Sequence, residues 1–436
     1  MPKKHYRPVE LARDHARPRH APAPSDAVLD ARLTEIVQPA TYTVVTQYHQ
    51  LGLRERVLTL PVMVCLLVTL VWRQVPGVRP LARLLARDQL LWNPPLRISQ
   101  QALNVRLRSL PPVLVAEVVH AILPELAQRA QARRRPHPAV ITRTEAAFPQ
   151  IWAVDATTLE ALFKKVGLLQ GIPQTVLGGK LLGALDVATK LPVQLVWDED
   201  PAVNDRTLLD RVIAQIPAGA LLLLDKGFFG FPFFDWCTEH GISFIIPDRP
   251  NTAVRTQTAV RQRGALQDER IELGRYRSNP CRYPVRRITL PVGESSYRYL
   301  TNVLDPECLP AREVVDLYRL RWRIEEAFLL TKRLLGLSYL WTGAANGIAL
   351  QVWATWLLYA ILVDLSDAVA EVLDLPLERI SLEMVFRGLY FAVGALSRGQ
   401  TTDPVAYLAH PDQRDLGIVK RPRPPTALDT ALRAVS

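Results

Sequence analysis

The sequence lacks the features that mark secreted and disulfide-stabilised proteins. Its 436 residues contain only four cysteines, which are widely separated and show no CxxC spacing. This pattern excludes a disulfide-stapled secreted domain and offers no zinc-ligand set, and it fits a reducing compartment. The basic N-terminus has no apolar stretch of the kind that a secretory signal requires. We therefore expect a cytoplasmic protein.

Motifs for nucleotide binding and for membrane insertion are also missing. No GxxxxGK[ST] loop occurs, which argues against a nucleotide cofactor. The apolar stretches 57–72 and 349–363 are shorter than the roughly 20 residues that cross a bilayer. We expect both to be buried core helices, and we expect no membrane partner.

Positive charge is what the chain has in excess. Lys and Arg number 53 against 42 Asp and Glu, which gives a net charge of +11. Such a balance favours a polyanionic partner, with nucleic acid ranked before an anionic membrane surface. The length and the 49% hydrophobic content allow two to four structural units with large cores.

Changes in composition divide the chain into four segments. Residues 1–28 form a basic, proline-rich tail, and residues 29–140 carry apolar residues at helical spacing, which predicts a helical DNA-binding domain. Residues 141–345 alternate strand-like apolar runs with helical patterns, which indicates a mixed α/β sheet flanked by helices. Within them, residues of about 250–299 alternate as in an antiparallel β insertion. Residues 346–436 are expected to form a C-terminal helical region with a flexible basic tail.

Two aspartates follow apolar runs of the α/β segment. Asp155 ends the run IWAVD, and Asp225 ends the run LLLLD. Carboxyl ends of buried strands are where α/β sheets commonly place their chemistry. The alternative for each residue is a plain capping role at the start of the next segment. Asp186, which also follows an apolar run, is expected to stabilise a turn.

A third acid lies on the helix expected over 311–336. At 100° per residue, Tyr318, Arg321, Glu325 and Lys332 fall within an arc of about 60°. This places a carboxylate, a guanidinium, an ammonium and a phenol on one face. The alternative is a solvated face with an ordinary Arg321–Glu325 ion pair. Trp322, on the same helix, could stack on a base near the site, but we expect it to pack in the core.

Three converging carboxylates would repel one another without a cation between them. Hard divalent ions prefer such oxygen ligands, so Asp155, Asp225 and Glu325 predict a site for two Mg²⁺ ions, with Mn²⁺ able to replace them. Two ions of this kind promote in-line displacement at phosphorus.

The sequence YRLRWRIEEAFLLTK satisfies the pattern Tyr-x2-Arg-x3-Glu-x6-Lys. In this it resembles bacterial insertion-sequence DDE transposases of the insertion-sequence family four type. The similarity extends to VDATTL, LLLLDKGFFG and YRYLTNVLD, although Lys226 stands where the family commonly has arginine. The resemblance implies a ribonuclease-H-like sheet with Asp155, Asp225 and Glu325 as the catalytic, metal-binding acids.

The same resemblance implies that Tyr318, Arg321 and Lys332 contact DNA near the cut. The activity it implies is Mg²⁺-dependent cleavage at transposon inverted-repeat ends, followed by strand transfer into target DNA. At least a homodimer is expected, because two ends must be brought together. Two alternatives stay open: an inactive transposase-derived DNA-binding protein, and a ribonuclease-H-like nuclease without strand transfer.

Overall fold

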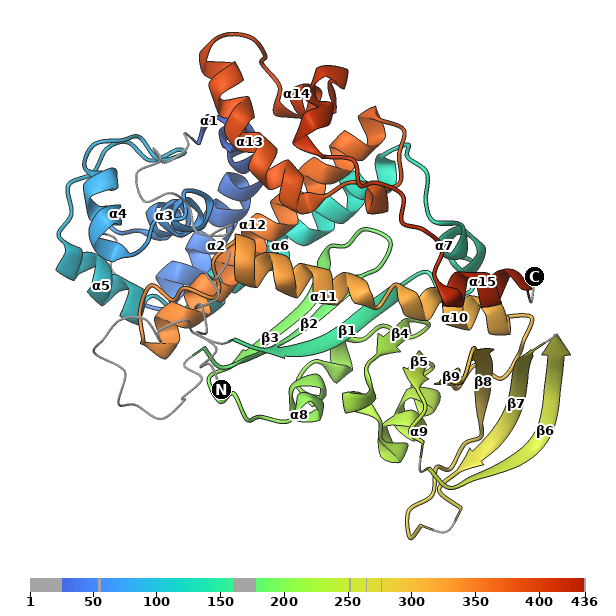
Figure 1. Cartoon of the computed structure of the whole chain (residues 1–436). Coiled ribbons are helices and arrows are strands. Elements are labelled where there is room, and N and C mark those ends of the chain that lie inside the picture. The colour runs from blue at the N-terminus through green and yellow to red at the C-terminus, as the bar shows by residue number, and fades with distance from the viewer. Residues whose placement is uncertain are drawn as a thin grey trace, which may run out of the picture.

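The protein consists of a large mixed sheet with helices on both faces and a helical part beside it (Figure 1). This computed structural model describes residues 26–53, 56–159, 178–250, 252–263, 265–275 and 277–434. The predicted basic tail, residues 1–28, lies outside the described residues except for its last three positions.

Nine strands form one continuous sheet in the order β3-β2-β1-β4-β5-β9-β8-β7-β6. They are β1 Ile151–Thr158, β2 Lys180–Asp186, β3 Pro192–Asp198, β4 Leu221–Leu224, β5 Ser243–Pro247, β6 Val254–Arg263, β7 Leu266–Leu273, β8 Val285–Val292 and β9 Ser295–Thr301. β4 pairs in parallel with both β1 and β5, whereas β2 pairs antiparallel with β1 and β3. The expected mixed α/β class is therefore confirmed.

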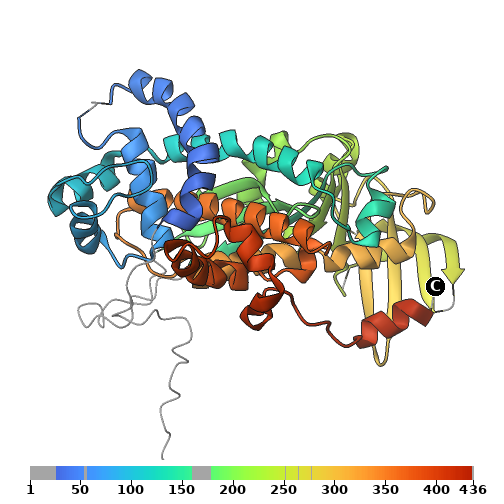
Figure 2. The same cartoon turned by 90° about the horizontal axis from the view of Figure 1, so that it is seen from above.

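The helices form before, within and after the sheet. They are α1 Ala27–Arg32, α2 Gln38–Gln50, α3 Leu60–Trp72, α4 Val78–Leu85, α5 Gln100–Ser109, α6 Pro112–Ala132, α7 Ala139–Thr144, α8 Asp205–Asp210, α9 Phe231–Glu239, α10 Ala311–Arg319, α11 Trp322–Leu329, α12 Ala345–Val372, α13 Leu382–Ser397, α14 Pro404–Ala409 and α15 Ala427–Ala434. Seen from above, the N-terminal helices and the β insertion lie at opposite ends of the molecule (Figure 2).

Alternation along the strands builds one apolar layer on each face of the sheet. On β1, Ala153 belongs to the cluster under α11 and α12, whereas Trp152 and Val154 belong to a second cluster with α8 and α9. The same division holds for β4, where Leu223 faces α11 and Leu224 faces the opposite layer. Both faces are covered, which explains the nearly continuous apolar runs of these strands.

The two apolar stretches are core helices, as expected. α3 and α12 pack together with α6 in the larger hydrophobic cluster. By length and composition α12 would suffice to cross a membrane, but 94% of its most apolar window is buried inside the protein. Its hydrophobicity is therefore accounted for by packing against α3, α6 and the sheet. The proposed limits of the domains stay a prediction.

The insertion β6–β9 is antiparallel, as its alternating sequence predicts. A buried arginine joins it to the chain before α10. Arg286 is fully buried and donates to both carboxylate oxygens of Asp268, at 3.0 and 2.6 Å, and to the carbonyl oxygen of Leu309 at 2.9 Å. Because a buried guanidinium is tolerated only when it is paired, this contact fixes the insertion relative to α10.

The helix expected over 311–336 is interrupted, which corrects the prediction of one uniform helix. Arg321 N donates to Tyr318 O and Ile324 N to Arg321 O, each at 3.1 Å, so the chain tightens to three-residue spacing between α10 and α11. After α11 it widens into a π-helical turn, Leu330–Leu334. An angular count at 100° per residue is therefore only approximate along this segment.

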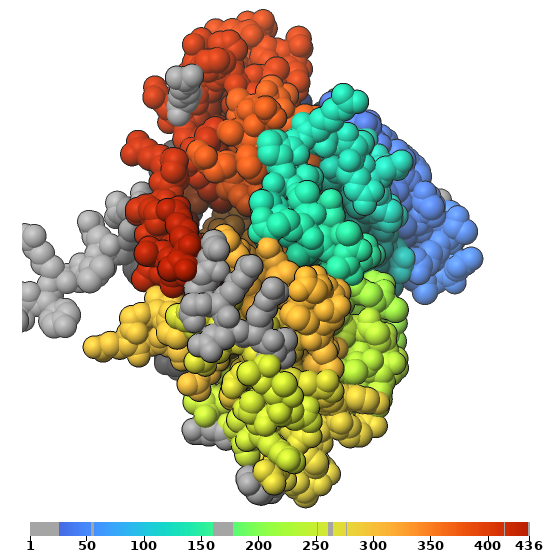
Figure 3. Space-filling model, turned by 90° about the vertical axis from the view of Figure 1, so that its right-hand side faces the viewer, coloured from blue at the N-terminus to red at the C-terminus, as the bar shows by residue number. Residues whose placement is uncertain are grey.

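The C-terminal segment, residues 420–434, is not a free tail, although a flexible tail was expected here. It crosses from the helical part to the β insertion, where α15 lies against β8 (Figure 3). Leu432 of α15 is buried, and Asp429 forms an ion pair of 2.7 Å with Arg319 of α10. Composition suggested mobility here because the segment is rich in proline and charge, but tertiary contacts hold it in place.

Candidate active site

Asp155 and Asp225 lie side by side on neighbouring parallel strands. β1 and β4 are in register at Val154 and Leu224, so the next residue on each strand is an aspartate. Since side chains alternate, both carboxylates point to the face that α11 covers. The sequence suggested that Asp155 ends its strand. In the structure β1 continues to Thr158, so Asp155 lies within the strand.

A glycine on the next strand allows α11 to approach the sheet at this point. Gly183 of β2 is the register partner of Asp155. A Cβ atom at Gly183 would lie 3.1 Å from Ile324 Cδ1 and 3.2 Å from Phe328 Cε1, tighter than ordinary van der Waals contact. The missing side chain therefore lets α11 bring Glu325 close to Asp155.

Enlarging Gly183 should impair the site more than it impairs the fold. We expect Gly183→Val to cost about 1–3 kcal/mol of unfolding free energy through overpacking, and to displace α11 and with it Glu325. Gly183→Ala is the graded control, because a single Cβ requires a shift of only a few tenths of an ångström. Thermal unfolding measures the first effect, and cleavage of DNA strands, the activity that the sequence leads us to expect, measures the second. Undiminished cleavage by the valine variant would show that this close approach does not matter.

Arg321 connects two of the three acids. Its guanidinium lies 3.2 Å from Asp155 Oδ2 and forms a second ion pair with Glu325. Only 6% of the residue is exposed, and its Nε atom has no hydrogen-bond partner. The polar face of the signature helix is therefore turned toward β1 and only partly exposed, so the ion pair belongs to a half-buried network.

The three acids interact electrostatically. Burial is the main reason that the pKa of Asp155 is raised to about 6. The carboxylates of Asp225 and Glu325 also raise it, while the guanidinium of Arg321 acts in the opposite direction. An acid that ionises near neutrality beside two further carboxylates is typical of a functional site. It is also a site at which a cation would relieve repulsion.

The metal-binding geometry is not preassembled. Among the residues that the structure describes, no three Asp, Glu, His or Cys side chains are gathered as a ready set of metal ligands. Arg321 occupies the position between Asp155 and Glu325 instead. The donor set of three carboxylates still fits a hard divalent cation by its chemistry.

Divalent metal should stabilise the protein in a pH-dependent way. At neutral pH we expect Mn²⁺ at a hundredfold excess over its Kd to add about 2.7 kcal/mol to the unfolding free energy. The effect should disappear as the pH falls through about 6, because Asp155 then takes up a proton. Without metal, the raised pKa means that stability is lost as the pH rises through the same value. Asp155→Asn should show neither change in a thermal melt, and an equal metal response in this variant would contradict the assignment.

The other residues of the signature have distinct positions. Tyr318 is buried, with its ring centroid 4.7 Å from that of Tyr299 on β9. Lys332 Nζ donates to the hydroxyl of Thr157 and, at 2.8 Å, to the carbonyl oxygen of Thr158. All the signature side chains thus face the sheet. Trp322 corrects another expectation, because it is 59% exposed and does not pack in the core.

A cleft of ≈ 1740 Å³ opens beside the acids. It is bounded by α10 and α11, by β9 of the insertion and by the C-terminal segment, and Asp225 lies in its wall. Ten basic side chains line it against five acidic ones, so its wall attracts an anion. The sequence-based search missed Arg143, Arg298 and Arg423, because three segments far apart in the chain contribute them.

Residues 146–361 match the protein family described as Transposase DDE domain. This match supports a DDE transposase. The matched segment contains Asp155, Asp225, Glu325 and the whole insertion, and it agrees with the resemblance seen in the sequence. The finer assignment to the family with the Tyr-x2-Arg-x3-Glu-x6-Lys signature stays a prediction.

One related protein is described as "Putative transposase y4zB", from Sinorhizobium fredii (strain NBRC 101917 / NGR234). It is 26% identical over 173 residues, which are 37% of this chain and 47% of that protein. The chain therefore spans about half the length of this relative. A solved structure, a cryo-EM piggyBac transposase synaptic complex with hairpin DNA, aligns over 91% of this chain and 84% of that one. Its identity is 11% and its TM-score 0.34, too low to support a conclusion.

Proposed function

We propose that the protein is a DNA transposase that cuts transposon inverted-repeat ends and joins them to target DNA. The observation that carries this proposal is that Asp155, Asp225 and Glu325, from two strands and a helix, interact electrostatically beside a basic cleft whose wall includes Asp225. The family match adds support on independent grounds.

The strand arrangement supports a ribonuclease-H-like catalytic unit. In the first five strands, β1 lies between antiparallel β2 and parallel β4, and β3 and β5 form the outer positions. This arrangement delivers two acids from adjacent central strands and a third from a helix packed across them. The insertion β6–β9 extends the sheet beyond β5 and supplies the opposite wall of the cleft.

The divalent metal would be two Mg²⁺ ions, or Mn²⁺ in their place. It would activate an attacking oxygen and stabilise the leaving oxygen. Asp155, Asp225 and Glu325 would hold it. Arg321 would give up at least one of its carboxylate contacts and become free to pair with a DNA phosphate, a role that suits its planar fork of donors. Tyr318 and Lys332 would contact the strand near the cut.

The N-terminal helices, within residues 29–140, are proposed to recognise the transposon ends. α5 begins at Ser99, whose Oγ accepts a hydrogen bond from Ala102 N at 3.1 Å, as the sequence predicts for an N-cap. Its outer face exposes Gln100, Gln101 and Arg108, while Leu103 packs inward. Amide and guanidinium groups of this kind read base edges in the major groove.

A plasmid assay tests the function. A supercoiled plasmid that carries the inverted repeats flanking the gene should be nicked at the repeat ends in Mg²⁺ or Mn²⁺, and not with a chelator. Joining to a second plasmid should follow. Cutting of generic structured DNA without preference for the repeats would favour a nuclease without strand transfer. Failure to cut with any metal, despite DNA binding, would favour an inactive DNA-binding descendant.

The assembly and location follow from the same proposal. Because two ends have to be joined together, we expect at least a homodimer on DNA in the bacterial cytoplasm. Sedimentation of the protein with and without end-containing duplex measures the assembly, and a complex with a single subunit and two ends would contradict it.

A further inference from the structure

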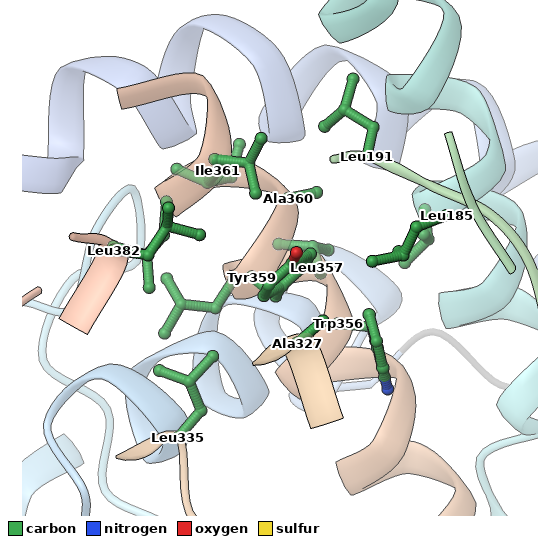
Figure 4. Close-up of a cluster of buried hydrophobic side chains, with 14 of the residues drawn as sticks. Leu185, Leu191, Ala327, Leu335, Trp356, Leu357, Tyr359, Ala360, Ile361 and Leu382 are labelled. Atoms are coloured by element: carbon green, nitrogen blue, oxygen red, sulfur yellow. The ribbon is translucent and has the colours of Figure 1, made fainter. Parts of the chain in front are cut away.

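A second cationic site lies on the side of α11 away from the three acids. A cavity of ≈ 250 Å³ is enclosed there by α11, by Tyr359 of α12, by the start of α13 and by the C-terminal segment. We call it the Lys190 pocket, after the lysine that lines it together with Arg323 and Lys420. Figure 4 shows the apolar floor of this region, where Ala327, Tyr359 and Leu382 from three helices come together.

Lys190 is buried without a partner. Only 4% of the residue is exposed, and among the described residues no side-chain hydrogen bond or ion pair of Lys190 is found. Burial is the main reason that its pKa is lowered to about 7, and the positive charges of Arg323 and Lys420 lower it further. An unpaired ammonium at a buried position is costly, so an anion bound beside Lys190 would favour its charged form.

The backbone holds Lys190 in a conformation that lysine rarely adopts. Its φ angle is +62°, a left-handed value that costs a residue with a side chain about 1–3 kcal/mol. The turn is fixed on both sides, because Asp186 Oδ1 accepts from Thr189 N and Oγ1 at 2.8 Å each, and the Tyr359 hydroxyl donates to Lys190 O at 3.1 Å. This confirms the turn role expected for Asp186. Strain maintained in this way is typical of a functional position.

Arg323 adds a second unsatisfied donor to the pocket. It is 6% exposed, and its Nη1 atom is buried without a hydrogen-bond partner, while Nη2 pairs with Glu378. Two carboxylates also belong to the surroundings: Glu326 lies 4.0 Å from Lys420, and Oε2 of Glu378 is buried without a partner. These acids neutralise part of the charge, but neither of them forms an ion pair with Lys190.

The pocket adjoins the large cleft, and the two share part of their lining. Lys190, Arg323, Glu326 and Lys420 line both spaces. An anion that reaches the pocket can therefore belong to a chain that also passes the acids. The volume has room for several waters of about 30 Å³ each, and so for a phosphate group with part of its hydration.

We propose that the Lys190 pocket binds a backbone phosphate of the DNA strand that occupies the cleft, with Lys190, Arg323 and Lys420 as its donors. The proposal rests on the proposed transposase function and adds a phosphate site that the signature residues do not include. Such a site would lie on the side of α11 away from the cut. It would fix the register of the bound DNA strand, because phosphate contacts position DNA without reading its sequence.

The experiment measures the salt dependence of DNA binding. Fluorescence anisotropy with a duplex carrying one terminal repeat is recorded between low and physiological salt for wild type, Lys190→Met and Lys190→Arg. Lys190→Met should reduce the slope of log K against log salt by about one, and should weaken binding roughly tenfold at physiological salt. Lys190→Arg should keep most of the slope. An unchanged slope in Lys190→Met overturns the proposal.

Thermal melts with inorganic phosphate supply the second arm. Phosphate should raise the Tm of wild type but not of Lys190→Met, relative to chloride at equal ionic strength. If phosphate stabilises wild type while the DNA slope does not depend on Lys190, the pocket serves a free small anion and the proposal is wrong. The matched control is Lys180→Met, because Lys180 lies on the same hairpin but donates to Val203 O at 2.8 Å and pairs with Asp205.

The control separates an anion site from an internal ion pair. Lys180→Met should lower the Tm, since it breaks satisfied contacts, whereas Lys190→Met should leave it equal or higher. A loss of Tm in Lys190→Met as large as that in Lys180→Met would show that Lys190 is an internal partner of Glu378. Cleavage by wild type with an unchanged Lys190 slope refutes only the pocket. A Lys190-dependent slope without any cleavage refutes only the transposase activity.

Discussion

Glu325→Gln should reduce DNA strand cleavage by at least about 10³-fold, because a lost carboxylate removes several kcal/mol of transition-state charge stabilisation in a metal-dependent site. The fold should survive, since Arg321 keeps its contact with Asp155 at 3.2 Å. Single-turnover nicking of repeat-bearing plasmid measures the effect, and circular dichroism confirms that the variant is folded.

The adjacent acid provides a matched control. Glu326 has the same side chain one position later, but it is 54% exposed and its nearest cation is Lys420 at 4.0 Å. Glu325 instead pairs with Arg321 beside Asp155. Glu326→Gln should therefore retain cleavage within about tenfold of wild type, the scale of an exposed charge. Equal losses in both variants would mean that the catalytic acid has been assigned wrongly.

The strands of the catalytic unit could be predicted because their signals are local. Each of β1, β2, β3, β4 and β5 is a short apolar run bounded by polar or turn residues, and such runs determine a buried strand without reference to the rest of the chain. The position of an aspartate directly after the run LLLL is visible for the same reason. The insertion was also predictable, because period-two alternation is visible in the sequence alone.

The arrangement of the acids depends on contacts that no local pattern contains. The tightening of the helix at Arg321 and the approach of α11 over Gly183 both arise from packing against the sheet. For this reason the sequence predicted a regular polar face but not the ion pair between Arg321 and Asp155. The exposure of Trp322 was missed in the same way, since an indole at helical spacing ordinarily packs inward.

The C-terminal segment is a second place where amino-acid composition alone gave the wrong structural prediction. Proline and charge predict a solvated tail, yet the ion pair between Asp429 and Arg319 and the burial of Leu432 hold α15 against the insertion. Both partners are remote in sequence. A single ion pair with a partly exposed arginine would be weak by itself, so the buried leucine is the stronger contribution.

Asp364→Ala should cause a large loss of stability among the helices. Asp364 of α12 is buried and pairs with Arg32 at 3.1 Å and with Arg133, at the end of α6, at 2.5 Å. The nearby Asp367 forms an ion pair with Arg133, with 2.9 Å between Oδ2 and Nη1, and a second ion pair with Arg135. Removing one carboxylate leaves buried arginine charge uncompensated, which costs about 3–5 kcal/mol. We expect the Tm to fall by about 3–5 °C for a chain of this length.

An exposed ion pair on α6 is the control. Glu125 pairs with Arg129 of α6 at 2.7 Å, but its side chain is 44% exposed, so Glu125→Ala should cost less than about 1 kcal/mol. If Asp364→Ala melted no earlier than Glu125→Ala, the buried network would contribute nothing to stability. Because the network joins α1, α6 and α12, its loss should also separate the melting of the N-terminal helices from that of the sheet. Two transitions by calorimetry, in place of one, would then show that these ion pairs couple the N-terminal helices to the rest of the protein.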